Sequence, residues 1–153
     1  MKKFLLVLTM MLVAMIPTTG VFAANPVPMT ATTAAQIVLI DVGTASLHFV
    51  SATNGGPVVV GTDSAALSFN ITNTGNVPIT ISVAVGGADA TFFNNCLFLS
   101  SGGAYSSVVG WTYTTAIPVD GSVTIYAKIH PLSVITGAAA TLTFIGTSTV
   151  PLT

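Results

Sequence analysis

The side chains that could carry out acid–base, nucleophilic or metal chemistry form a short set in this sequence. Apart from two lysines at the N-terminus there are four acidic residues, two histidines, one lysine, one cysteine and three tyrosines. In chain order these residues are Asp41, His48, Asp63, Asp89, Cys96, Tyr105, Tyr113, Asp120, Tyr126, Lys128 and His130. A nucleophilic triad needs a Ser or Cys, a His and an Asp held together. Because the sequence has no nucleophile-elbow pattern and no closely spaced carboxylate pair, we expect no catalytic residues and no enzymatic activity.

The nitrogen, sulfur and oxygen donors are too few and too far apart for a metal-binding motif. A structural zinc site takes four Cys or His ligands, and a catalytic one takes three protein ligands. The Cys and His residues of this chain are His48, Cys96 and His130, with no close spacing. Asp63 and Asp89 stand singly, without the repeated acidic spacing of an EF-hand loop. The sequence therefore predicts neither a metal site nor a cofactor.

The charge content of the chain excludes a further class of function. Charged residues make up 5% of the sequence, whereas about 25% is usual in a soluble domain. Nucleic-acid-binding proteins neutralise phosphates with clustered Lys and Arg, and this chain has no basic patch for that purpose. Hydrophobic residues account for 52% of the chain, too many for a charge-rich disordered tail. We therefore expect a folded domain that does not bind nucleic acid.

The first 23 residues have the three parts of a secretory signal peptide. Lys2 and Lys3 supply the positive charge, residues 4–16 are apolar except for one Thr, and residues 21–23 fit a small-x-small cleavage site. The apolar run is shorter than the roughly 20 residues that a membrane span needs. We predict cleavage after Ala23, no stable membrane anchor, and an extracellular or cell-surface location.

The elements that position the remaining residues have the patterns of strands and turns. Apolar and polar residues alternate over residues 64–73 and 78–85 on either side of an Asn-Thr-Gly-Asn turn, which predicts a β-hairpin. The same alternation recurs over residues 122–131. Shorter strands are expected at residues 47–50, 58–60, 96–100, 108–114 and 141–145. No segment has a sustained helical period, so residues 41–153 are predicted to form an all-β, Ig-like or jelly-roll sandwich.

Alternation also predicts which way the polar side chains point. His48, Asn70, Lys128 and His130 fall on outward positions of their predicted strands. Asn70 begins the one Asn-x-Thr sequon, so it is a candidate for a glycan. Cys96, as the only cysteine, has two interpretations: a buried apolar residue or one half of an intermolecular disulfide.

Residues 24–40 form an extended N-terminal segment of unusual composition. Residues 24–33 are uncharged and have no helix signal, and residues 34–40 are apolar except for Gln36. A continuous apolar run favours burial on both faces of a strand. The run is interpreted either as a donor strand that inserts into a neighbouring subunit through Ile37, Val38, Leu39 and Ile40, or as the first core strand of its own subunit. In the second case residues 24–33 could themselves be the segment that leaves the domain.

The layout and one motif together resemble a known family. A signal peptide, an extended segment and a sandwich carrying LSFNITNTGNVPITISVAV at residues 67–85 resemble the TasA/camelysin-like secreted filament proteins, in particular the related archaeal bundling pilins. The resemblance implies a homopolymer built head to tail by donor-strand complementation. The prediction is therefore a structural subunit of an extracellular pilus or biofilm matrix fibre. The alternative is a monomeric secreted Ig-like module that binds a ligand or the cell surface.

Overall fold

The structure is a computed structural model of the chain that describes residues 35–44 and 46–151. These residues belong to one compact unit. The predicted signal peptide and the first eleven residues after it, 24–34, lie outside the described part of the chain.

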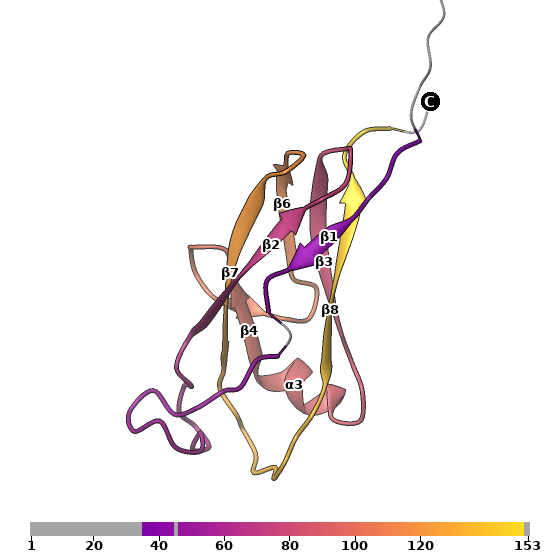
Figure 1. Cartoon of the computed structure of the whole chain (residues 1–153). Coiled ribbons are helices and arrows are strands. Elements are labelled where there is room, and N and C mark those ends of the chain that lie inside the picture. Colours follow the sequence, from indigo (N-terminus) through magenta and orange to yellow (C-terminus); the bar gives the residue numbers. More distant parts are fainter. Residues whose placement is uncertain (1–34, 45, 152–153) are drawn as a thin grey trace, which may run out of the picture. The chain divides into compact units, whose positions relative to one another are not determined.

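Two antiparallel sheets make up most of this unit, with one short helix, α3 (Ala90–Cys96), at the end that Figure 1 shows lowest. One sheet has the order β1-β2-β7-β4-β5 and the other the order β6-β3-β8. The strands are β1 Ile40–Val42, β2 Leu67–Asn73, β3 Ile79–Gly86, β4 Leu97–Ser100, β5 Ser106–Ser107, β6 Thr112–Ile117, β7 Ser122–Ile129 and β8 Thr141–Ser148. The expectation of a mostly β, two-sheet sandwich is confirmed.

The core forms where the alternating apolar residues of the two sheets meet. In β2 and β7 the pairs Phe69↔Ile125 and Ile71↔Val123 are buried, whereas the residues between them are largely exposed. The rings of Phe69 and Phe144 meet edge to face across the two sheets, with centroids 5.6 Å apart. Each fully buried aliphatic or aromatic side chain contributes about 1.5–3 kcal/mol, so the period-2 pattern accounts for both the strands and their packing.

The predicted hairpin of β2 and β3 is wrong, because the two strands belong to different sheets. Asn73, at the end of β2, is fully buried instead of facing solvent in the turn. Its Nδ2 donates to the carbonyl oxygens of Val77 (2.8 Å), Ile117 (3.1 Å) and Pro118 (3.1 Å). Its Oδ1 accepts a 3.0 Å bond from the amide of Gly75. The Asn73 side chain provides hydrogen-bond partners for the backbone groups where the chain crosses between the sheets. This crossing closes the end of the sandwich that is uppermost in Figure 1.

Several shorter elements also differ from expectation. Residues 47–50 and 58–60 are not strands; the first stretch leads only to an isolated bridge between Ser51 and Ser64. Its alternation is nevertheless real, because Leu47 and Phe49 turn inward and His48 outward without a sheet neighbour. The strand expected at 96–100 starts at 97, and the one expected at 108–114 is displaced to β6. Helix α3 is seven residues long, too short to show a helical period in the sequence.

The segment at 35–42 lies against its own subunit. Strand β1 pairs with β2, with Ile40 opposite Asn73. Before it, the amide of Ile37 donates to Asn76 Oδ1 (2.7 Å), and the carbonyl of Ile37 accepts from the amide of Asn76 (3.0 Å). Leu39 accepts from the amide of Thr74 at 3.0 Å. Insertion of Ile37, Val38, Leu39 and Ile40 into a neighbouring subunit stays a prediction, but in the single chain these residues have internal partners.

Candidate functional site

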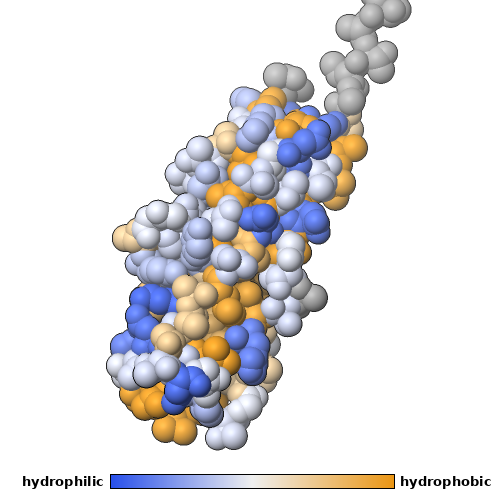
Figure 2. Space-filling view, turned by 60° about the vertical axis from the view of Figure 1, so that its left-hand side comes forward, coloured by the Kyte–Doolittle hydropathy of each residue, from blue (hydrophilic) through white to orange (hydrophobic). Residues whose placement is uncertain are grey.

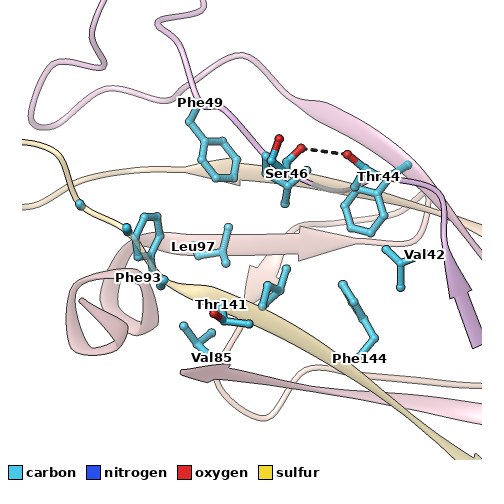
Figure 3. Close-up of a pocket in the computed structure, with 15 residues that line it drawn as sticks. Val42, Thr44, Ser46, Phe49, Val85, Phe93, Leu97, Thr141 and Phe144 are labelled. Atoms are coloured by element: carbon cyan, nitrogen blue, oxygen red, sulfur yellow. Dashed lines mark hydrogen bonds between the residues drawn. The ribbon is translucent and has the colours of Figure 1, made fainter. Parts of the chain in front are cut away.

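An open, apolar groove lies between the edges of the two sheets. β1 ends after three residues, whereas β8, at the edge of the other sheet, continues for eight. Beyond the end of β1 the two edges are separated by a cavity of about 390 Å³, which we call the groove (Figure 3). Its lining residues are Val42, Thr44, Ser46, Leu47, Phe49, Phe69, Val85, Phe93, Leu97, Ala138, Ala139, Ala140, Thr141, Leu142 and Phe144.

The groove has two walls of extended backbone and an apolar floor. Figure 3 shows Thr44 and Phe49 along one wall and Thr141 and Phe144 on the other, with Leu97 between them. The outer edge of β8 has no strand partner among the residues that the structure describes. Exposed sheet edges pair readily with an extended peptide, which gains main-chain hydrogen bonds while alternate side chains fill pockets. The groove therefore suits an extended apolar strand.

The chain's own N-terminal segment already fills the upper part of this open side. A Cβ atom placed on Gly146 of β8 would lie 2.9 Å from Val38 Cγ1 and 3.2 Å from Ile40 Cγ2, so both side chains pack directly on the β8 backbone. The side-chain Nε2 of Gln36 donates to the carbonyl of Pro151 at 3.3 Å. What remains for another strand is the lower part, beyond Val42.

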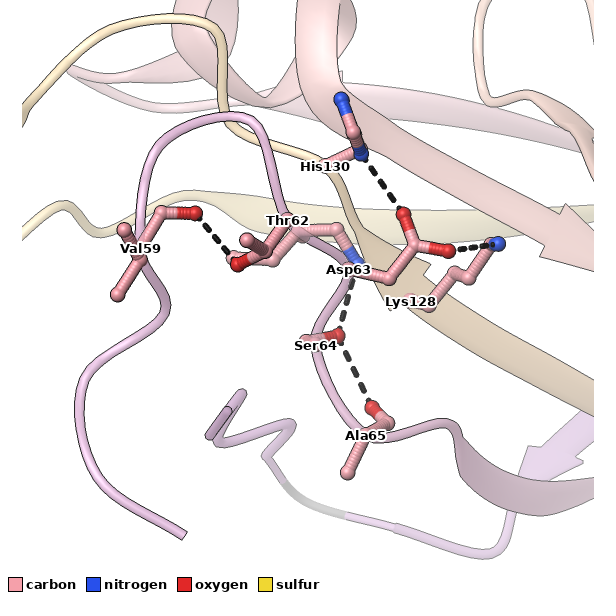
Figure 4. A network of polar contacts seen from close by, with 8 residues as sticks. Val59, Thr62, Asp63, Ser64, Ala65, Lys128 and His130 are labelled. Carbon is pink, nitrogen blue, oxygen red and sulfur yellow. Dashed lines mark hydrogen bonds and ion pairs between the residues drawn. The ribbon is translucent and has the colours of Figure 1, made fainter. Parts of the chain in front are cut away.

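A second cluster, of charged residues, joins the chain before β2 to the end of β7 (Figure 4). Lys128 Nζ donates to Asp63 Oδ2 at 2.5 Å, and His130 Nδ1 lies 2.8 Å from Asp63 Oδ1. The hydrogen bond from Lys128, and then that with His130, holds the pKa of Asp63 below its ordinary value. Lys128 Nζ also lies 4.6 Å from the centroid of the Tyr105 ring, a cation–π distance.

This cluster holds a loop against β7. Next to Asp63, the backbone of Ser64 donates to the carbonyl of Ile129 at 2.9 Å, and Ser64 Oγ accepts from the amide of Ile129 at 3.0 Å. Figure 4 shows the second ring nitrogen of His130 pointing away from Asp63. The arrangement holds one loop onto β7. The outward position of Lys128 predicts a solvated side chain, but in the structure its ammonium group is paired with Asp63.

The other residues singled out in the sequence do not converge. His48 and Asn70 are exposed, as alternation predicts. Asn70 Oδ1 accepts a 2.8 Å bond from Thr124 on the outer face of the sheet, and its glycosylation stays a prediction. Asp89 Oδ2 accepts a 2.8 Å hydrogen bond from the backbone amide of Ala139. Within the described ranges no group of three or more His, Cys, Asp or Glu side chains is placed to hold a metal ion.

Cys96 is buried at the end of α3, and burial raises the pKa of its thiol to about 11. At pH 8 only about one such thiol in a thousand is ionised, against roughly a quarter for a free cysteine. We expect no labelling of the native protein by a thiol-specific reagent at pH 8, and complete labelling in denaturant, as followed by mass spectrometry. Rapid native labelling, or a disulfide-linked dimer on a non-reducing gel, would contradict the buried position.

No protein-family model, curated protein or solved structure that was compared with this chain matches it. In the described part of the chain no helix combines the length and the apolar character that crossing a membrane requires. The fold and the groove define the class of this protein: it is mostly β, with two antiparallel sheets and an apolar groove along one open side.

Proposed function

We propose that this protein is a secreted structural subunit of an extracellular filament, a pilus or matrix fibre, that polymerises by donor-strand complementation. Its two sheets would form a sandwich of Ig-like or jelly-roll type that lacks a strand along one side. One observation supports this assignment above all: the groove is apolar and is bordered by an edge of β8 that has no strand partner in the described part of the chain. The donor is the N-terminal segment of a second copy of the chain.

The donor segment is assigned to residues 24–34. Residues 37–40 already have partners in their own subunit, so they are not free to leave without breaking those bonds. Extended at about 3.3 Å per residue, residues 24–34 reach roughly 36 Å, which exceeds the roughly 26 Å length of β8. They contain no charged residue, which suits a dry groove.

The order of residues in this segment fits pairing with one edge. Along a strand, alternate residues share a face and also share the direction of their backbone N–H and C=O groups. In one of the two strand directions, Val27, Met29 and Ala31 would turn their side chains toward the groove and their backbone N–H and C=O groups toward β8, and Pro26 and Pro28, which lack an N–H, would fall on the other side. Main-chain bonds matter here, because burying two larger side chains contributes about 3–6 kcal/mol and ordering each residue costs about 1–2 kcal/mol.

Deleting residues 24–34 from the mature chain tests the proposal. The deletion stops at Ala34 because Ile40–Val42 completes the chain's own sheet. We expect filaments from the full mature chain by electron microscopy, and only monomer from the deleted chain by size exclusion. The deleted chain should bind a synthetic peptide of residues 24–34, since its groove remains open.

A peptide in which Val27 and Met29 are replaced by Asp is the matched control and should not bind. Filaments from the deleted chain would exclude the donor-strand mechanism. A stable monomer of the full mature chain at high concentration would favour the monomeric secreted module instead.

A further inference from the structure

Two loops at the lower end of the sandwich expose large aliphatic side chains. One loop carries Val59 and Val60, and the other, between β7 and β8, carries Leu132, Val134 and Ile135; we call these five residues the mouth. Leu132 is 69% and Val134 85% exposed. Figure 2 shows hydrophobic surface gathered at this end of the molecule. Single exposed aliphatic residues are ordinary, but a contiguous group of this kind marks an interaction surface.

The mouth is continuous with the groove. A hollow of about 780 Å³ is lined by all of the mouth residues except Leu132. Leu47, Phe49, Phe93 and Ala138 line this hollow and also line the groove. The groove therefore opens at the lower end between the two loops.

The loops are held in place, so the exposure of the mouth is a fixed feature of the fold. The amide of Gly61, next to Val60, donates to the carbonyl of Pro131, next to Leu132, at 2.9 Å. Asp63 then anchors the same loop to β7 through Lys128 and His130. This combination ties the two mouth loops to each other and to the sheet.

The described unit begins at the opposite end of the sandwich, at Ala35. Ala35 lies beside the β2–β3 turn, because its carbonyl accepts a 2.9 Å bond from Asn76 Nδ2. Near Ala35, the side chains of Ile37, Leu39 and Val150 are 49%, 54% and 42% exposed. The upper part of a neighbour's open side is filled by its own residues 37–40, so a segment that starts here and runs along the lower part of that groove can enter it end-on through the neighbour's mouth.

From this geometry we propose, resting on the donor-strand function above, that the mouth is a second subunit–subunit contact. It receives the upper end of the neighbouring copy, with Ile37 and Leu39 of the donor against Val134 and the other mouth residues of the acceptor. The two surfaces differ, so the contact is heterologous and repeats along a fibre without closing into a dimer.

The chemistry of the mouth favours a second copy over a lipid surface. Segments that bind membranes by their surface combine aliphatic residues with Lys or Arg and with interfacial Trp or Tyr. The five mouth residues include none of these types, and the ammonium group of nearby Lys128 is paired with Asp63. The upper end of a second copy matches the mouth, because Ile37 and Leu39 are likewise aliphatic and uncharged.

A pair of engineered cysteines tests the contact in filaments. The mature chain carrying Ile37→Cys and Val134→Cys is assembled and then oxidised. We expect a ladder of disulfide-linked multimers on a non-reducing gel, because each contact joins one upper end to one mouth. The matched control pairs Ile37→Cys with Val109→Cys, which is 64% exposed on the β5–β6 connection, and should give no ladder.

A substitution at the mouth gives an independent measurement. Val134→Asp should raise the protein concentration needed for assembly at least about tenfold, a loss of about 1.4 kcal/mol per contact, whereas Val109→Asp should leave it unchanged. The chain lacking residues 24–34 with Val134→Asp should still bind the 24–34 peptide, since the groove is intact.

The outcomes separate this proposal from the one on which it rests. Filaments that depend on residues 24–34 but give no ladder, with an unchanged assembly threshold for Val134→Asp, would overturn the mouth contact and leave the donor-strand function standing. No filaments from the parent chain would overturn both. Flotation of the parent chain with phosphatidylcholine vesicles, lost in Val134→Asp, would identify a lipid surface and overturn the contact.

Discussion

Asn73→Asp is expected to prevent stable folding. The change replaces the Nδ2 group, which donates to three carbonyl oxygens, with an oxygen that faces the same three acceptors inside a fully buried site. Burying an unpaired carboxylate, or protonating it to avoid the charge, costs several kcal/mol. Because a domain of this kind has about 5–15 kcal/mol of stability in total, we expect little or no cooperative transition in urea, followed by circular dichroism.

The matched control for this substitution is Asn70→Asp, three residues earlier on the same strand. Asn70 is exposed, so the same change in atoms should alter the free energy of unfolding by no more than about 0.5 kcal/mol. Both proteins should be made in a host that does not glycosylate, so that the sequon has no effect. A transition of Asn73→Asp within about 1 kcal/mol of the parent would show that the crossing between the sheets does not depend on this side chain.

Gly75→Val is expected to detach residues 35–39 from their own subunit. A Cβ at this position would lie only 2.2 Å from the carbonyl oxygen of Ile37 and 2.9 Å from the amide nitrogen of Leu39. The segment would lose its four hydrogen bonds to the β2–β3 turn, about 1 kcal/mol each, together with the packing of Val38 and Ile40. We expect a loss of about 3 kcal/mol or more and fast amide exchange at 37–42.

Gly103→Val is the matched control for this second substitution. No atom lies within 4 Å of a Cβ at Gly103, and that residue is exposed. Its amide-exchange pattern at 37–42 should therefore equal that of the parent. Unchanged exchange in Gly75→Val would mean that the close approach of Ile37 to the turn is not maintained in solution.

The strands with a buried face were predictable because alternation records that burial directly. β2, β3 and β7 lie where the period-2 pattern is longest, whereas β8 continues three residues beyond the short strand expected at 141–145. The partner of β2 was not predictable, since an Asn-Thr-Gly-Asn turn serves a hairpin equally well when its Asn faces solvent. In the structure Asn73 is buried instead, and it donates to the carbonyls of Val77 and Ile117 where the chain crosses to the other sheet.

The groove and the charged cluster had no complete signature in the sequence. Phe49, Phe69, Phe93 and Phe144 come together from four distant segments, and each alone looks like an ordinary core residue. Lys128 and His130 are two residues apart, which does predict a shared strand face. Their partner Asp63 lies more than sixty residues upstream, and nothing local marks it.

The pairing of Lys128 with Asp63 has a consequence for the environment in which assembly works. Lys128 is the only Lys or Arg residue after the predicted cleavage site, and its side chain is already paired with Asp63 within its own subunit. Contacts between copies then have no unpaired Lys or Arg side chain with which to form ion pairs that dissolved salt could screen. Salts excluded from apolar surface strengthen burial, so a fibre made of these subunits should hold together at least as well in brine as in fresh water.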